Sequence, residues 1–470
     1  TGRTEPASDL YALGATLYFA LTASDPQLLT IFDIHLHWQQ GISFPPARQS
    51  TSQVSAEMEA ILANATRVLA KDRYPSARAM LDELRTLQTI QQSTLCPHCQ
   101  ATHCRGCRTP PLPLPAQKPA VVPQRQPQNW SSFRGNATRA GFTTDHLRAP
   151  LQAGWSFQTQ GPIDGSPIIH NGIVYVSSRD EWLYALEVHQ QRELWRYHAN
   201  AALRSTPTLH GDTLFFGDDH GTMHAVQSIG GAARWRVPLR GKIFASSAAG
   251  AGLIISATQG GHVVALTPTS GETIWDHVDS SPFYASPAIL SNLVIVANGT
   301  GQVKGLDITS GKLEWTFQVP GQVRATPACY DGLTLVATLD GSVTLLNILA
   351  GERLWQRSLG IPISASPILT RDYIFAAGQD GALFALSRQD GTPIWATRVP
   401  GQLAASPILS GTTLLVINTD GTVLLLDAHS GTIGFQHALG APVFASPAVY
   451  GPWCVIGTRQ GSLCLLEGKL

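Results

Sequence analysis

Residues 286–315 read SPAILSNLVIVANGTGQVKGLDITSGKLEW. Short apolar runs alternate with turn residues along this stretch, and a glycine-rich turn separates two of the runs. Such runs are typical of β-strands, and glycine between two of them indicates a hairpin. The stretch therefore predicts four short strands: one after Ser286-Pro287, then Leu293–Ala297, Gln302–Leu306 and a last strand that ends at Trp315.

This pattern recurs every 40 residues, and residues 151–470 hold eight periods. A Ser-Pro or Thr-Pro pair and a turn glycine repeat in phase with a tryptophan, and Ser246-Ser247 is the one place where the proline is missing. The tryptophan series is Trp155, Trp195, Trp235, Trp275, Trp315, Trp355 and Trp395, with Phe435 in the next place.

A period near 40 residues with four strands is typical of one propeller blade. We therefore expect a mainly β fold, an eight-bladed β-propeller with four antiparallel strands per blade. The repeats begin with a lone tryptophan-bearing strand at Leu151–Phe157 and end after Ser462–Leu466 without a fourth strand. These two strands should pair in the eighth blade and remove the exposed sheet edges. The alternative is a linear β-solenoid, which needs no complementary ends.

An A-x-D-x-x-x-G-x-x-x-W pattern ends at each tryptophan, with Asp307 and Asp427 at its third position. It resembles the tryptophan-docking repeat of the pyrroloquinoline-quinone-like (PQQ-like) propellers, which include quinoprotein alcohol dehydrogenases and outer-membrane assembly scaffold lipoproteins. Asn129–Asn136 also resembles the segment that precedes such propellers. The repeated tryptophans are expected to be structural, buried between blades with their N–H groups hydrogen-bonded.

The resemblance leaves open whether the propeller is an enzyme. A quinoprotein dehydrogenase of this family would need a calcium site, a catalytic aspartate and, in many members, two adjacent cysteines. No two cysteines are adjacent in the sequence, and its candidate acids are scattered, so the sequence disfavours PQQ as a cofactor. These acids are Asp164, Asp218, Asp219 and Asp276. Cys329, Cys454 and Cys464 are expected to be small core residues.

The position two residues before each Ser/Thr of the Ser-Pro series differs from repeat to repeat. Its preceding neighbour is always apolar, so alternation should turn the variable side chains to the opposite face. We expect them to ring one mouth of the central channel, together with hairpins such as Asp218–Gly221. Arginines with aromatics favour a protein partner or a small anionic or aromatic ligand. A solvated rim without a ligand is the alternative, and the opposite rim near Tyr330 and Tyr450 is the next candidate. The predicted binding residues are Asp164, Arg204, Phe244, Tyr284, Arg324 and Phe444.

Residues 1–92 differ in character from the repeats. Apolar residues at helical spacing follow Ser8-Asp9 and predict an α-helical subdomain. The strings SDLYALGATLYFALTA and LAKDRYPSA resemble the carboxy-terminal lobe of bacterial serine/threonine protein kinases. The resemblance implies structural roles for two residues: Asp9 would bond the catalytic loop, and Arg73 would pair with the activation-segment glutamate.

The sequence lacks the glycine-rich loop, phosphate-binding lysine, H-R-D and D-F-G motifs of a kinase, and it begins at Thr1. We therefore expect a catalytically incomplete fragment of a regulatory kinase, whose intact parent alone would bind ATP and Mg²⁺. Its propeller would act as a sensor or docking module. The alternatives are a stand-alone propeller scaffold of the outer-membrane assembly type and, less favoured, a quinoprotein dehydrogenase.

Residues 93–108 contain the spacing C-x₂-C-x₄-C-x₂-C. Two C-x-x-C knuckles can hold structural zinc, although the spacer between them is short; His98 or His103 could replace one thiolate. Two disulfides or free thiols are the alternatives. Residues 109–128 form a proline-rich linker before the propeller at 129–470. The predicted zinc ligands are Cys96, Cys99, Cys104 and Cys107.

Composition excludes two classes of partner. Lysine plus arginine and aspartate plus glutamate both number 32, and only 14% of residues are charged, so there is no overall attraction to nucleic acid. No apolar run approaches the roughly 20 residues of a membrane helix, so we expect no membrane insertion. A kinase lobe and a zinc knuckle in one chain predict a cytoplasmic location.

Overall fold

The computed structural model describes residues 127–468. These residues lie within one compact unit of the chain, Pro123–Leu470. The predictions of a helical kinase lobe (with Asp9 and Arg73), of a zinc knuckle and of most of the proline-rich linker lie outside the described residues.

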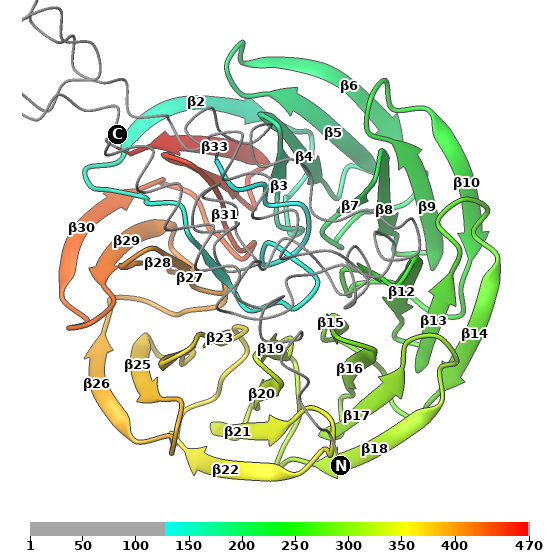
Figure 1. Cartoon of the computed structure of the whole chain (residues 1–470). Coiled ribbons are helices and arrows are strands. Elements are labelled where there is room, and N and C mark those ends of the chain that lie inside the picture. The colour runs from blue at the N-terminus through cyan, green and yellow to red at the C-terminus, as the bar shows by residue number, and fades with distance from the viewer. Residues whose placement is uncertain (1–126, 469–470) are drawn as a thin grey trace, which may run out of the picture. The chain divides into compact units, whose positions relative to one another are not determined.

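The described residues form an eight-bladed propeller with four antiparallel strands per blade, as predicted (Figure 1). Seven of the sheets have four strands, and the seventh blade has a fifth strand, the short β1 (Phe142–Thr143), added in parallel to its inner edge. In each of the first seven blades, the four strands run in sequence order from the axis outward. Blades one to four are β3 (Ile168–His170), β4 (Ile173–Ser177), β5 (Trp182–Glu187), β6 (Arg192–His198); β7 (Thr208–His210), β8 (Thr213–Gly217), β9 (Thr222–Gln227), β10 (Ala233–Pro238); β11 (Ala248–Gly250), β12 (Leu253–Ala257), β13 (His262–Leu266), β14 (Thr273–Val278); and β15 (Ala288–Leu290), β16 (Leu293–Ala297), β17 (Gln302–Asp307), β18 (Leu313–Gln318). Blades five to seven are β19 (Ala328–Tyr330), β20 (Leu333–Ala337), β21 (Ser342–Asn347), β22 (Arg353–Ser358); β23 (Ile368–Leu369), β24 (Tyr373–Ala377), β25 (Ala382–Ser387), β26 (Pro393–Arg398); and β27 (Ile408–Ser410), β28 (Thr413–Ile417), β29 (Thr422–Asp427), β30 (Ile433–Ala438).

The eighth blade closes the ring with strands from both ends of the repeat region. Its inner three strands are β31 (Ala448–Tyr450), β32 (Trp453–Gly457) and β33 (Ser462–Glu467), and its outer strand is β2 (Gln152–Gln158). β2 pairs antiparallel with β33, so that Phe157 lies opposite Leu463, and Figure 1 shows the cyan β2 beside the red β33. The predicted closure is confirmed, and the solenoid alternative is wrong.

The fourth strand of each blade differs from the prediction in one respect. It was expected to end at the tryptophan, yet β18 continues three residues beyond Trp315 to Gln318. The extension is paired along its length, since Gln318 lies opposite Gln302 of β17. Side chains on this strand alternate between exposed and partly buried because only one face packs against the next blade.

The repeated tryptophans join neighbouring blades. The indole N–H of each donates to the backbone carbonyl 33 residues later, in the next blade, as Trp275 does to Ile308 at 2.8 Å. A glycine of the next blade lies against the ring. Gly311 has a positive φ of 68°, and a Cβ there would stand 2.5 Å from Trp275 Cδ2, so no side chain fits. The repeat period is therefore set by a docking contact between blades.

A second inter-blade contact forms a closed belt close to the propeller axis. The Ser/Thr hydroxyl of each Ser-Pro position accepts a hydrogen bond from the backbone N–H of the equivalent residue one blade earlier, at 2.9–3.0 Å. Ser446 N–H donates to Ser166 and completes the circle. The exception noted in the sequence, Ser246-Ser247, lacks the proline but keeps the hydroxyl, so the belt is unbroken. Its members are Ser166, Thr206, Ser246, Ser286, Thr326, Ser366, Ser406 and Ser446.

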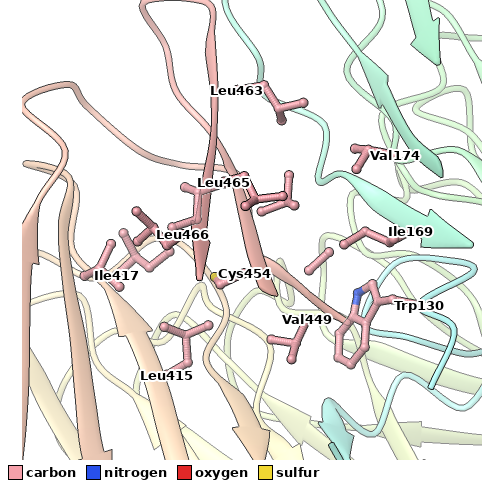
Figure 2. Close-up of a cluster of buried hydrophobic side chains, with 14 of the residues drawn as sticks. Trp130, Ile169, Val174, Leu415, Ile417, Val449, Cys454, Leu463, Leu465 and Leu466 are labelled. Atoms are coloured by element: carbon pink, nitrogen blue, oxygen red, sulfur yellow. The ribbon is translucent and has the colours of Figure 1, made fainter. Parts of the chain in front are cut away.

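The segment between Gln128 and Leu147, here called the lead-in, lies across one end of the axis, on the innermost strands. Its backbone carbonyls accept hydrogen bonds from the inner strands of six blades, and its short β1 (Phe142–Thr143) pairs parallel with β27. Trp130 packs near Ile169 and Val449 in a core cluster shared by the first, seventh and eighth blades (Figure 2). The inner-strand donors are Ile169, Leu209, Ile289, Cys329, Leu369 and Leu409.

Two arginines of the lead-in are fully buried. Arg134 donates to the carbonyls of Arg139, Ser366, Pro367 and Pro407. Arg139 donates to five other backbone carbonyls. No carboxylate of residues 127–468 lies within ion-pair distance of either guanidinium, and burial lowers the pKa of both to about 9, so both stay charged at neutral pH. Gly141 leaves the space that Arg134 fills, because a Cβ at Gly141 would stand 1.8 Å from its Nη2.

Candidate docking site

The eight variable positions lie at the end of the propeller axis away from the lead-in. Each directly precedes the small residue that leads into the belt, four residues before the inner strand begins, so the ring stands on the segment that enters the inner strand. The apolar neighbours are buried, as Ile163 and Leu203 illustrate, whereas the ring side chains are at least partly exposed. Alternation in this extended segment thus produces the expected division of faces.

Four of the predicted residues form a continuous series of contacts over blades eight, one, two and three. Arg204 stacks over Phe244, with its guanidinium carbon 5.0 Å from the ring centroid. Its Nη1 lies 3.8 Å from Asp164. On the other side of Asp164, Arg459 donates from Nε to Oδ1 at 3.0 Å and lies 3.6 Å over the ring of Phe444.

Two predicted residues stand apart from that series. Arg324 lies over the ring of Tyr284 at 5.0 Å, and none of the ion pairs formed among residues 127–468 includes Arg324. Farther round the ring, Ser364 accepts a hydrogen bond from Gln379 at 2.9 Å. The ring therefore has a charged arc on one side and a separate arginine–tyrosine pair on the other.

Arg179 and Arg459 also belong to the site, although they were not predicted from the sequence. Both come from the hairpin between the second and third strands, fifteen residues after a ring position, where Asp219 and Gln379 also lie. Arg179 Nη1 is 3.6 Å from Asp164, and Asp219 accepts both contacts of the Arg204 Nε at 2.9 and 3.1 Å. This hairpin position also differs from repeat to repeat, so comparing it at the 40-residue period would have identified both arginines. Hairpins and ring positions share one face, as expected from Asp218–Gly221.

The four acids considered for catalysis do not gather at one place. Asp218 is buried and bonds His224 at 2.9 Å; burial acts to raise its pKa, but hydrogen bonds from His224 and the Thr222 backbone outweigh this and leave the pKa below its usual value. Asp276 bonds His262. Asp164 and Asp219, by contrast, are joined through Arg204, so these two are not scattered.

The three cysteines of the described residues lie within the β-structure. Burial raises the pKa of the Cys329 thiol to about 12 and raises that of Cys454 as well. Cys464 is half-buried on β33, opposite Ile456 of the neighbouring β32. Cys329 and Cys454 are fully buried, in agreement with the expectation for core residues.

The rim near Tyr330 and Tyr450, which was the next candidate, is in contact with the lead-in. Phe142 packs edge-on against Tyr330 with ring centroids 5.5 Å apart. Asp145 accepts a hydrogen bond from the Gly451 N–H, next to Tyr450, at 2.7 Å. The chain's own segment occupies this rim, which leaves the arginine-bearing rim as the candidate site.

No group of three or more His, Cys, Asp or Glu side chains within residues 127–468 is arranged to hold a metal ion. The same residues contain no helix long and apolar enough to cross a membrane.

The architecture and the docked tryptophans define a β-propeller of the PQQ-like repeat class. The sequence pattern of the family described as outer membrane protein assembly factor BamB matches residues 152–251, 259–408 and 349–469, more than half of the chain. The chain belongs to this family.

Solved structures share the fold at low sequence identity. BamB from Moraxella catarrhalis is 20% identical with a TM-score of 0.62, covering 68% of this chain and 100% of its own. A europium-containing methanol dehydrogenase is 12% identical with a TM-score of 0.64, covering 72% and 98%. The quinohemoprotein alcohol dehydrogenase from Comamonas testosteroni is 12% identical with a TM-score of 0.63, covering 73% and 81%. No curated protein sequence matches the chain.

Proposed function

We propose that the propeller is a protein-docking module that captures its partner on the arginine-bearing rim. The observation that carries this proposal is that structural positions recur in the repeat whereas the positions at one rim vary. The belt hydroxyls recur in all eight blades and the docking tryptophan in seven, whereas charged and aromatic side chains that differ between blades gather at one rim. Recognition requires such blade-specific side chains, and arginine and aromatic residues are enriched where proteins bind one another.

The rim is tested by the double substitution Arg204→Ala and Arg324→Ala, with Arg353→Ala on β22 as the matched control. Arg353 is exposed and makes one side-chain hydrogen bond, to Gln356. Because Arg204 is held by Asp219, we expect the double variant to lose about 1 kcal/mol of stability, more than a fully exposed substitution would, and to remain folded. Affinity capture should recover partners with the wild type and Arg353→Ala but not with the double variant. Recovery of the same partners by all three would remove this rim as the site.

The amino-terminal resemblance extends the proposal. In this reading the docking module serves a bacterial serine/threonine kinase in the cytoplasm, and partner or ligand occupancy regulates phosphate transfer. It is supported by the strings around Asp9 and Arg73 alone. Reading the gene upstream of Thr1 tests it: an intact H-R-D and D-F-G would establish an active parent kinase, and their absence in a folded lobe would indicate a pseudokinase.

Structural zinc at Cys96, Cys99, Cys104 and Cys107 is part of the same proposal. Elemental analysis of the purified chain should give about one zinc per molecule, because four thiolates at two C-x-x-C knuckles suit tetrahedral coordination. The Cys96→Ser variant should lose the metal. As a control, Cys329→Ser should keep it, since Cys329 is a buried propeller residue. Four thiols that titrate freely in a zinc-free wild-type protein would contradict the site.

Quinone catalysis is the competing function, and the likeness to the two dehydrogenases supports only the fold. Titration with PQQ separates the two. Tight calcium-dependent binding accompanied by dye-linked alcohol oxidation would replace the docking function.

A further inference from the structure

Three guanidinium groups converge on one carboxylate at the rim. Arg179, Arg204 and Arg459 approach Asp164 from three different blades at 3.6, 3.8 and 3.0 Å. They are called the arginine arc below. The Asp164 side chain is only 13% exposed, whereas the three arginines are 31–44% exposed. The carboxylate therefore lies beneath cations that still face solvent.

Two of these guanidiniums are held by their Nε atoms and their faces, so that their terminal amino groups make no hydrogen bond within residues 127–468. Arg459 donates a hydrogen bond from Nε to Asp164, and its guanidinium stacks over the Phe444 ring. Arg204 likewise donates from Nε to Asp219, and its guanidinium stacks over the Phe244 ring. Neither donates a hydrogen bond from a terminal amino group to another residue among 127–468. A guanidinium fixed by its Nε and its face loses little freedom when its terminal amino groups bind a planar oxyanion.

The charges of the arc select the kind of oxyanion. Three arginines against Asp164 and Asp219 leave one net positive charge. One carboxylate neutralises this charge, whereas a phosphate group, with a charge of about −1.5 to −2, would reverse it.

We infer that the arginine arc binds carboxylate side chains of an acidic peptide segment, and that Asp164 competes with them for the same guanidiniums. This inference rests on the proposed docking function and names the chemistry of the partner. Asp164, predicted from sequence as a binding residue, then acts as a built-in competitor that lowers affinity. It does so because its negative charge offsets part of the positive charge that attracts the partner's carboxylates.

The test measures binding of a short fluorescein-labelled peptide of alternating glutamate and glycine to the full chain by fluorescence anisotropy. The Asp164→Asn variant keeps an oxygen that can accept from Arg459 Nε but removes the negative charge. We expect it to bind the probe about tenfold more tightly than the wild type, the effect of one added charge-assisted hydrogen bond. Asp380→Asn is the matched control. Asp380 pairs with one arginine, Arg398, and its substitution changes the net charge by the same amount.

Arg459→Gln should weaken binding at least about tenfold, and Arg459→Lys should restore it only in part, because an ammonium lacks the planar fork. The glutamine form of the peptide should not bind, and affinity for the glutamate peptide should fall with added salt. Equal gains for Asp164→Asn and Asp380→Asn, or full affinity in Arg459→Gln, would overturn the inference. Tighter binding of the same peptide with phosphoserine in place of glutamate would show that phosphate is the ligand group.

The outcomes separate this inference from the proposed function. Probe binding that follows Asp164 and Arg459, in a chain that captures no protein through the rim, would leave the carboxylate site standing without the docking function. Capture of a protein partner that does not change in the Asp164→Asn variant would support the docking function and contradict the carboxylate site.

Discussion

Replacement of Arg139 by alanine is expected to lower the free energy of unfolding by at least about 3 kcal/mol. The substitution removes a fully buried side chain whose guanidinium donates to five backbone carbonyls. It leaves the carbonyls of Phe133, Ser246 and Pro287 without a donor among residues 127–468, whereas Ser247 O still accepts from the Thr208 hydroxyl. Urea denaturation followed by intrinsic fluorescence measures the loss. The five carbonyls are those of Phe133, Asn136, Ser246, Ser247 and Pro287.

Two further variants make this experiment decisive. Arg139→Lys keeps a positive charge but has three donors in a compact ammonium, so it should be nearly as destabilising as alanine. Arg353→Ala on an outer strand should change stability by less than about 0.5 kcal/mol. An Arg139→Ala protein as stable as Arg353→Ala would show that the buried Arg139 guanidinium contributes nothing to the stability of the propeller.

Replacement of β2 by a glycine–serine linker of the same length should have an effect of comparable or larger size. It removes the pairing with β33 and the docking of Trp155, whose indole N–H donates to Val188 in the first blade at 3.1 Å. Loss of a large aromatic from such a contact costs about 3–5 kcal/mol, and the uncovered edge of β33 invites pairing with a second molecule.

Thermal unfolding together with size-exclusion chromatography measures both effects. We expect a lower unfolding midpoint and a dimer fraction that is absent in the wild type. The single substitution Gln152→Ser on the exposed end of β2 serves as the control and should leave both unchanged. An unchanged midpoint after the linker replacement would contradict closure by β2.

The periodic part of the fold could be predicted because each contact that builds it recurs every 40 residues. Trp275 with Gly311 is one such contact, and the hydroxyl of Ser246 with the Thr206 N–H is another. Strand number, blade number and closure follow from the phase of these signals. The end of the fourth strand was misplaced because only one of the three residues after Trp315, Phe317, is apolar.

The lead-in could not be predicted in the same way, because it occurs once. Arginine is seldom buried without a carboxylate, so Arg134 and Arg139 read as surface residues in sequence. Their acceptors are backbone carbonyls, which leave no trace in the residue types. The ring positions of Arg204 and Asp164 were predicted from the sequence. The contact between Asp164 and Arg459 was not, because it depends on how far a hairpin reaches toward the axis in the folded blade.

The lead-in also constrains how this gene can evolve. Tandem repeats of near-identical length are readily gained or lost by unequal recombination, and a ring of seven or nine blades could in principle close by the same tryptophan contacts. The lead-in does not repeat, yet it bonds to particular blades in a fixed order, from Ile169 in the first to Leu409 in the seventh and Gly451 in the eighth. Losing or gaining one blade would shift every later partner by one place and leave the carbonyls around Arg134 and Arg139 without their donors. A single unrepeated stretch of about twenty residues thus keeps all its hydrogen bonds only in a propeller of eight blades.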